Sequence, residues 1–148
     1  MSVLVKQAIT EIRTAIMDAA GRAVADGEFP AVPLGDFIVE VPANRDNGDY
    51  SSNAAMAWAR VFKKAPRQIA EILLANADFE GSYIAKTEIA GPGFMNIYLS
   101  NRFYSDIVLD VLEQNENYGR STHGKGKSVL VEFVSANPTG PMHIGNAR

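Results

Sequence analysis

The stretch YIAKTEIAGPGFMNIYLS, residues 83–100, decides the fold class. Apolar and polar side chains alternate over residues 83–90 and again over 94–100, which is the period of a strand with one buried face. The GPG tripeptide between them suits a tight turn, because glycine and proline readily take turn conformations. The stretch therefore predicts an antiparallel hairpin.

Helical patterns flank this hairpin. Residues 3–25 carry apolar side chains at spacings of three and four, which predicts one amphipathic helix. A helix over 66–77 is expected because proline suits its first turn, and another is expected over 101–117. In that last helix we expect a set of apolar side chains to face inward: Phe103, Ile107, Val108, Val111 and Leu112.

The segment between the first helix and residue 66 predicts a strand and one more helix. Residues 37–41 form a short apolar run that Pro42 stops. Ser51 or Ser52 suits the start of a helix to about residue 64, and Asp49 and Tyr50 are expected to shape its entry. Residues 1–118 therefore predict an α+β domain in which helices pack on a small antiparallel sheet.

A second domain is expected to follow. Residues 119–127 are glycine-rich and basic, which is typical of a linker, and 128–134 form an apolar, β-branched run typical of a central parallel strand. Residues 135–146, SANPTGPMHIGN, lead through a turn to a helix start, where free backbone N–H groups favour anions. This order is typical of the first strand and phosphate-binding turn of a Rossmann-like domain.

Three blocks of the chain resemble one family. The segment VEFVSANPTGPMHIGNAR at 131–148 closely resembles the signature of class I aminoacyl-tRNA synthetases, in the form typical of arginyl-tRNA synthetases. GDYSSNAAM at 48–56 and AGPGFMNI at 90–97 resemble segments of the N-terminal additional domain of that family. The resemblance implies an additional domain at 1–118, a linker at 119–127 and the start of a truncated catalytic domain at 128–148.

The resemblance also implies residue roles in the catalytic domain. The positions that match the arginine-binding site are Glu132, Ser135 and Asn137. A carboxylate at 132 suits arginine, because it accepts two parallel N–H bonds from a guanidinium. The positions that match the ATP-binding signature are His143, Gly145 and Asn146. His143 and Asn146 are its catalytic positions, and Asn146 stands where the signature often has a second histidine.

In the same family the additional domain contacts the D-loop corner of tRNA. Phe94 and Asn96 match a base-stacking aromatic and an amide that reads a base edge, which is the chemistry by which unpaired bases are recognised. By residue type alone, a phenylalanine in a strand is more often part of the core. Strand alternation, however, places Phe94, Asn96 and Tyr98 opposite the apolar residues 95, 97 and 99, which favours an exposed Phe94.

The resemblance implies that the chain is the N-terminal part of an arginine–tRNA ligase, which attaches L-arginine to its tRNA by way of arginyl-adenylate. ATP is then a substrate, Mg²⁺ assists in the full enzyme, and the partners are arginine-accepting tRNA and L-arginine. We expect the full enzyme to be a monomer and the 148 residues alone to be inactive. Two alternatives are a stand-alone RNA-binding module derived from a synthetase and an adenylyltransferase with a similar histidine–glycine signature.

The composition narrows the possible partners and sites. The formal net charge is -3, which argues against a basic arm that coats nucleic acid, so any RNA contact is expected to be local. The chain has no cysteine and only two histidines, His123 and His143, so no metal site is expected. No apolar stretch approaches the roughly twenty residues of a membrane span, so we expect a cytoplasmic protein without a membrane partner.

Overall fold

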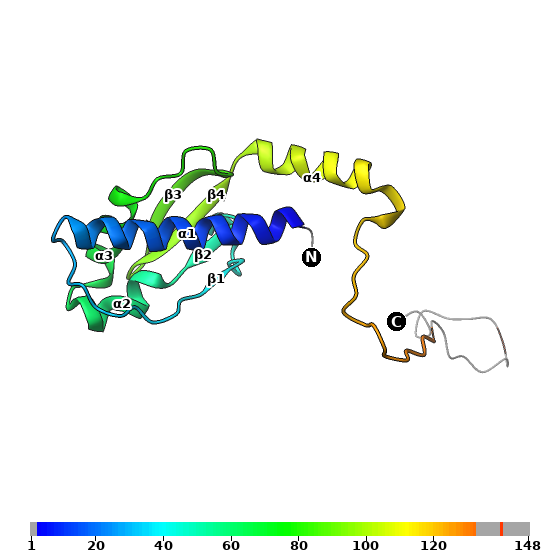
Figure 1. Cartoon of the computed structure of the whole chain (residues 1–148), viewed down its shortest axis with the longest axis horizontal. Helices are drawn as coiled ribbons and strands as arrows, with labels where there is room; N and C mark the ends of the chain where they lie inside the picture. The colour runs from blue at the N-terminus through cyan, green and yellow to red at the C-terminus, as the bar shows by residue number, and fades with distance from the viewer. Residues whose placement is uncertain (1–2, 133–139, 141–148) are drawn as a thin grey trace.

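The structure, a computed structural model, describes residues 3–132 and 140. These residues form an antiparallel sheet in the order β1-β2-β4-β3, with helices on one of its faces (Figure 1). The strands are β1 (Val39–Glu40), β2 (Tyr50–Ser52), β3 (Ile84–Ala90) and β4 (Phe94–Leu99). The helices are α1 (Val3–Ala25), α2 (Ala54–Phe62), α3 (Pro66–Asn76) and α4 (Asn101–Gln114), with short 3₁₀ helices η1 (Arg45–Asn47) and η2 (Asn115–Asn117). The predicted α+β class is confirmed.

The hairpin of β3 and β4 forms as predicted, and its register fixes the faces of the sheet. Ala90 pairs with Phe94 beside the turn, Glu88 pairs with Asn96, and Lys86 pairs with Tyr98. On its other side, β4 pairs with β2, so β4 lies inside the sheet. Because side chains alternate along a strand, residues 94, 96 and 98 point away from the face that carries 95, 97 and 99.

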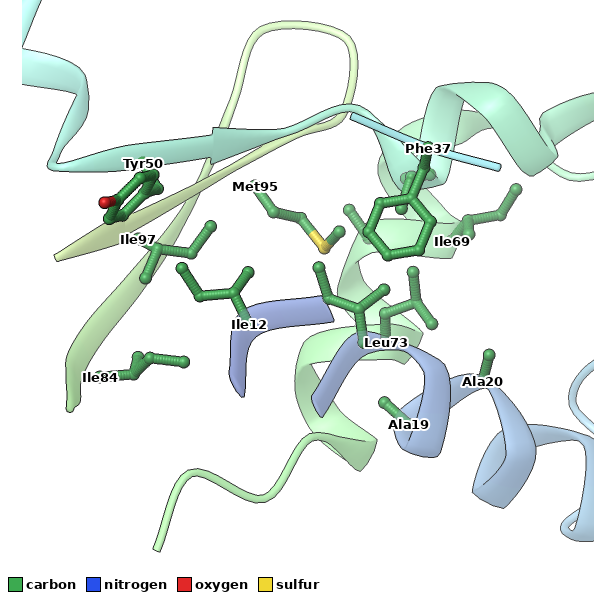
Figure 2. Close-up of a cluster of buried hydrophobic side chains, with 14 of the residues drawn as sticks. Ile12, Ala19, Ala20, Phe37, Tyr50, Ile69, Leu73, Ile84, Met95 and Ile97 are labelled. Carbon is green, nitrogen blue, oxygen red and sulfur yellow. The ribbon is translucent and has the colours of Figure 1, made fainter. Parts of the chain in front are cut away.

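The core lies between the sheet and the helices α1, α2 and α3 (Figure 2). Met95 and Ile97 of β4 meet Ile12 of α1, together with Ile69 and Leu73 of α3. All five side chains are almost completely buried. Each such side chain stabilises the fold by about 1.5–3 kcal/mol relative to its exposed state. This face of the sheet is therefore buried in the core and not available to a ligand.

Two side chains fasten the loop between α1 and β1 to the helices. The indole Nε1 of Trp58 donates a hydrogen bond to the Gly35 carbonyl oxygen at 2.8 Å. Arg13 donates to the Phe37 carbonyl oxygen at 2.6 Å and forms an ion pair with Asp36. The loop therefore delivers β1 to the edge of the sheet beside β2.

The prediction of a helix entry at residues 49–52 was wrong, because Tyr50–Ser52 is the strand β2. Tyr50 pairs with Ile97 and is buried, and α2 begins only at Ala54. Gly48 has a φ of 91°, and a Cβ atom there would lie 2.6 Å from the Ile97 carbonyl oxygen. The close approach of Gly48 to β4 brings Tyr50–Ser52 alongside that strand. Such a strand is too short to show a period in the sequence.

The expected inward face of α4 was correct for Phe103 and for Ile107, which packs against the core, and wrong for Val108, Val111 and Leu112. Phe103 is buried, where it makes an edge contact with Tyr83. Val108 and Leu112 are exposed, at 57% and 70% of their surface, because α4 extends away from the sheet and the packed helices (Figure 1). Beyond Ile107, the apolar spacing in α4 therefore does not mark a buried face within the described residues.

Residues 128–132, predicted as part of a strand, form no strand and are exposed. Residues 133 and 134 of that prediction lie outside the described residues. A central parallel strand needs backbone partners on both sides, and no described segment pairs with 128–132.

Candidate nucleic-acid interface

The face of the sheet opposite the helices carries polar and aromatic side chains. β4 contributes Phe94, Asn96 and Tyr98 to this face, and the register places Ser51 of β2 directly opposite Asn96. Glu88 of β3 lies on the other side of Asn96. We call this surface, made of Phe94, Asn96, Tyr98, Ser51, Glu88 and Lys86, the open face.

Phe94 is the aromatic residue at the turn end of the open face. It is 38% exposed, whereas the next residue, Met95, is fully buried on the helix side. Its cross-strand neighbour is the small Ala90, so one flank of the ring carries little side-chain bulk. Phe94 therefore offers a π surface that a nucleobase could stack upon.

Asn96 shares this face with Phe94 but is only 4% exposed. The hydroxyl of Ser51, itself 8% exposed, donates a hydrogen bond to Asn96 Oδ1 at 3.1 Å. The alternation in the sequence predicted the face of Asn96 correctly, but it did not predict this burial. Cross-strand neighbours on both sides account for it, and they became known only with the register.

A charged cluster lies at the far end of the open face. Lys86 Nζ lies 2.5 Å from Glu88 Oε1, and the Tyr98 hydroxyl donates to Glu88 Oε2 at 2.7 Å. The Asp46 carbonyl oxygen lies 3.0 Å from the same hydroxyl, which joins the η1 loop to the cluster. The Lys86 ammonium lies 5.1 Å from the centre of the Tyr98 ring, within the range of a cation–π contact.

Hydrogen bonds within this cluster set its charge state. The hydrogen bonds from Lys86 and Tyr98 lower the pKa of Glu88, and the hydrogen bond to Glu88 raises the pKa of Lys86. The same carboxylate raises the pKa of Tyr98 by accepting a hydrogen bond from its hydroxyl. At neutral pH the cluster therefore holds one carboxylate and one ammonium, and its net charge is close to zero.

The open face thus combines an exposed ring, an amide and a neutralised ion pair. These groups suit an unpaired base, which offers a π face and hydrogen-bonding edges, better than they suit a run of phosphates. The sequence patterns did not predict Ser51, Lys86 and Glu88 as members of this surface. Lys86 and Glu88 are two residues apart in β3 and pair with Tyr98 and Asn96, so the strand period could have placed them on this face once the register was known.

The residues predicted for arginine and ATP are not brought together in the described part of the chain. Glu132 is exposed and lies in a segment without helix or strand. The other predicted positions lie outside the described residues: Ser135, Asn137, His143, Gly145 and Asn146. That site therefore stays a prediction.

A family model described as "Arginyl tRNA synthetase N terminal domain" matches residues 6–99. The match covers the sheet and the three helices packed on it, and it ends with β4. The chain belongs to this family of arginyl-tRNA synthetase N-terminal domains. Membership accounts for the resemblance of the two blocks at 48–56 and 90–97.

Curated relatives of this synthetase domain match almost the whole chain. An arginine–tRNA ligase of Ruminiclostridium cellulolyticum is 46% identical over 138 residues, which is 93% of this chain and 24% of that protein. An arginine–tRNA ligase of Acetivibrio thermocellus is 43% identical over 97% of this chain and 25% of its own length. The chain therefore spans about a quarter of the length of these relatives.

A solved structure supports the fold of the synthetase domain. The crystal structure of arginyl-tRNA synthetase from Plasmodium falciparum matches with a TM-score of 0.52 at 20% identity, over 66% of this chain and 17% of that one.

In the described ranges 3–132 and 140, no helix is long and apolar enough to span a membrane. Within the same ranges, acidic residues and histidines form no cluster suited to a metal ion.

Proposed function

We propose that this chain is the tRNA-contacting N-terminal part of an arginine–tRNA ligase. In this proposal Phe94 stacks on an unpaired base of the tRNA D-loop, and Asn96 forms a hydrogen bond with the edge of a base. The observation that carries the proposal is the exposure of Phe94 beside Asn96 on the open face, while Met95 and Ile97 anchor the same strand in the core.

The electrostatics of the open face support local recognition of bases. Lys86 is paired with Glu88, so this face offers no run of free cations for the backbone of an RNA. Binding that releases few counterions depends weakly on salt. We therefore expect a shallow salt dependence and an affinity that responds mainly to the bases of the loop.

The reaction of the full-length ligase belongs to the same proposal. The arginine carboxylate attacks the α-phosphorus of ATP, which gives arginyl-adenylate and pyrophosphate, and the arginyl group then passes to the terminal ribose of the tRNA. Bound Mg²⁺ would neutralise phosphate charge. Residues 128–148 would supply the first piece of this site, through Glu132 for arginine and His143 for ATP. A cytoplasmic location also stays a prediction.

The first experiment measures binding of the chain to arginine-accepting tRNA and to a version with an altered D-loop, at several salt concentrations. We expect tighter binding to the unaltered loop, and a loss of about five- to 150-fold for Phe94→Ala, because stacking on an aromatic ring contributes about 1–3 kcal/mol per base. Met17→Ala is the matched control, since Met17 is an exposed apolar residue of α1, on the helix side of the sheet.

Two outcomes would contradict the proposal. Equal binding to both loops would remove the D-loop as the target of this domain. Equal weakening by Phe94→Ala and Met17→Ala would mean that Phe94 has no special part in the contact. Arginine-dependent exchange of pyrophosphate into ATP by the pure chain would contradict the separate expectation that these 148 residues alone are inactive.

A further inference from the structure

Asn96 has one end of its amide engaged and the other end available. Its Oδ1 accepts the hydrogen bond from Ser51 at 3.1 Å, while its Nδ2 donates no hydrogen bond within the described residues. No buried side-chain nitrogen or oxygen in those residues lacks a partner, so Nδ2 retains contact with solvent. A ligand that reaches the open face therefore meets the N–H end of this amide.

The surroundings of Asn96 favour this orientation over its reverse. A side-chain amide that turns over exchanges its donor and its acceptor. Reversal would place Nδ2 against the Ser51 hydroxyl, which would then accept this hydrogen bond. The hydroxyl proton would lose its acceptor among the described residues, which is costly in a side chain that is only 8% exposed. Reversal would also turn an oxygen toward β3, where the acidic residue Glu88 is the cross-strand neighbour of Asn96. Ser51 of β2 and Glu88 of β3 therefore favour the same orientation of the Asn96 amide.

We propose that Ser51 is a positioning residue, which holds Asn96 so that its Nδ2 donates a hydrogen bond to an acceptor atom on the edge of a nucleobase. The inference rests on the proposed function and deepens it, because it assigns a direction to the hydrogen bond. Ser51 itself does not contact the base. It converts an amide that could donate or accept into a donor of fixed orientation.

The test compares Ser51→Ala with Ser51→Thr. The measured quantity is the ratio of affinities for arginine-accepting tRNA with the unaltered and the altered D-loop. We expect Ser51→Ala to lower this ratio by about five- to tenfold, the effect of one hydrogen bond of ordinary strength. Ser51→Thr keeps the hydroxyl and should keep the ratio, and thermal unfolding of each variant reports whether β2 is intact.

A double-mutant cycle separates positioning from a general structural effect. If Ser51 acts through the amide, Ser51→Ala should cause no further loss of discrimination in an Asn96→Ala background. A structural defect in β2 would persist in that background. A further loss of the same size there would overturn the inference.

Asn96→Asp tests the direction of the bond even if Ser51→Ala fails to fold. The aspartate keeps an acceptor for the Ser51 proton but has no N–H group, so we expect it to lose discrimination as Asn96→Ala does. Its added charge weakens binding to both tRNAs, and the ratio removes that effect. Full discrimination by Asn96→Asp would overturn the inference while leaving the proposed function intact. Loop-blind binding by the unaltered chain would instead overturn both.

Discussion

Gly93 lies directly against the backbone of Pro66. Its φ is 145°, and a Cβ atom at this position would lie 2.8 Å from the Pro66 carbonyl carbon. The hairpin turn therefore packs on Pro66, the first residue of α3. The contact lies at the residue immediately before Phe94, where β4 begins. This contact links the helix layer to the strand that carries the open face.

Replacement of Gly93 should therefore be costly. We expect Gly93→Ala to lower the free energy of unfolding by about 2–4 kcal/mol, through an unfavourable backbone conformation and a clash with backbone atoms. Gly91→Ala is the control from the same turn, because Gly91 has a φ of 50° and no atom near its hypothetical Cβ. Its cost should be about 1–2 kcal/mol. Urea denaturation measures both, and equal losses would contradict the packing argument.

Two neighbouring residues of β4 should respond in opposite ways. Met95 is fully buried, so Met95→Ala should lower the free energy of unfolding by about 2–5 kcal/mol. Phe94→Ala should change it by less than about 1 kcal/mol, because the ring is 38% exposed and faces away from the core. Chemical denaturation checks the pair. A large loss of stability for Phe94→Ala would identify Phe94 as a core residue and remove it as a stacking platform.

The contact between Tyr104 and Asp49 should make stability depend on alkaline pH. Partial burial of the ring and the hydrogen bond to Asp49 raise the pKa of Tyr104 to about 12. The unfolded chain releases the same proton near pH 10, so the folded state binds it more tightly. This contribution is therefore complete below pH 10 and is lost as the pH rises toward 12.

Tyr104→Phe isolates that contribution. The variant should show a smaller fall in the free energy of unfolding between about pH 10 and 12 than the unaltered chain. Some fall should remain, because the pKa values of Tyr50, Tyr83 and Tyr98 are also raised. Urea denaturation at several pH values, with tyrosinate absorbance as a second signal, measures the difference. Identical pH profiles would show that Tyr104 is not the group responsible.

Mutations should affect stability differently in the first part of α4, which packs against the core, and in its exposed outer part. Leu112 is 70% exposed, so Leu112→Gln should change the free energy of unfolding by less than about 0.5 kcal/mol. Phe103 is buried, so Phe103→Ala should cost about 3–5 kcal/mol. A large loss for Leu112→Gln would mean that the outer part of α4 packs against something.

Local sequence patterns predicted the elements that depend mainly on interactions between residues close in the sequence. The spacing of apolar residues predicted α1 with its observed bounds, and alternation around a GPG turn predicted the β3–β4 hairpin. The strand β2 was missed because pairing with β4 and the approach of Gly48 create it, and neither is a local property. The face of α4 was wrongly predicted beyond Ile107, because apolar spacing indicates an apolar stripe but not the presence of a packing partner.

The sequence likewise predicted some residues of the candidate interface and missed others. Its aromatic residue and its amide were predicted from resemblance and from the strand period. The partner of the amide was not, because Ser51 lies 45 residues away in the sequence and reaches Asn96 only through the register of the sheet. The residues predicted for ATP and arginine, apart from Glu132, lie outside the described part of the chain, so their roles stay predictions.

The length of α4 has a directional consequence. Its 14 residues rise by about 1.5 Å each, so the helix displaces the chain by about 20 Å. Every residue also turns the helix by roughly 100°, so a single insertion would swing whatever follows residue 114 around the helix axis by that angle. Insertion of four residues would leave the direction about 40° from the original one while adding about 6 Å. The number of residues in α4 therefore sets both how far the chain is displaced and the direction in which it leaves the helix.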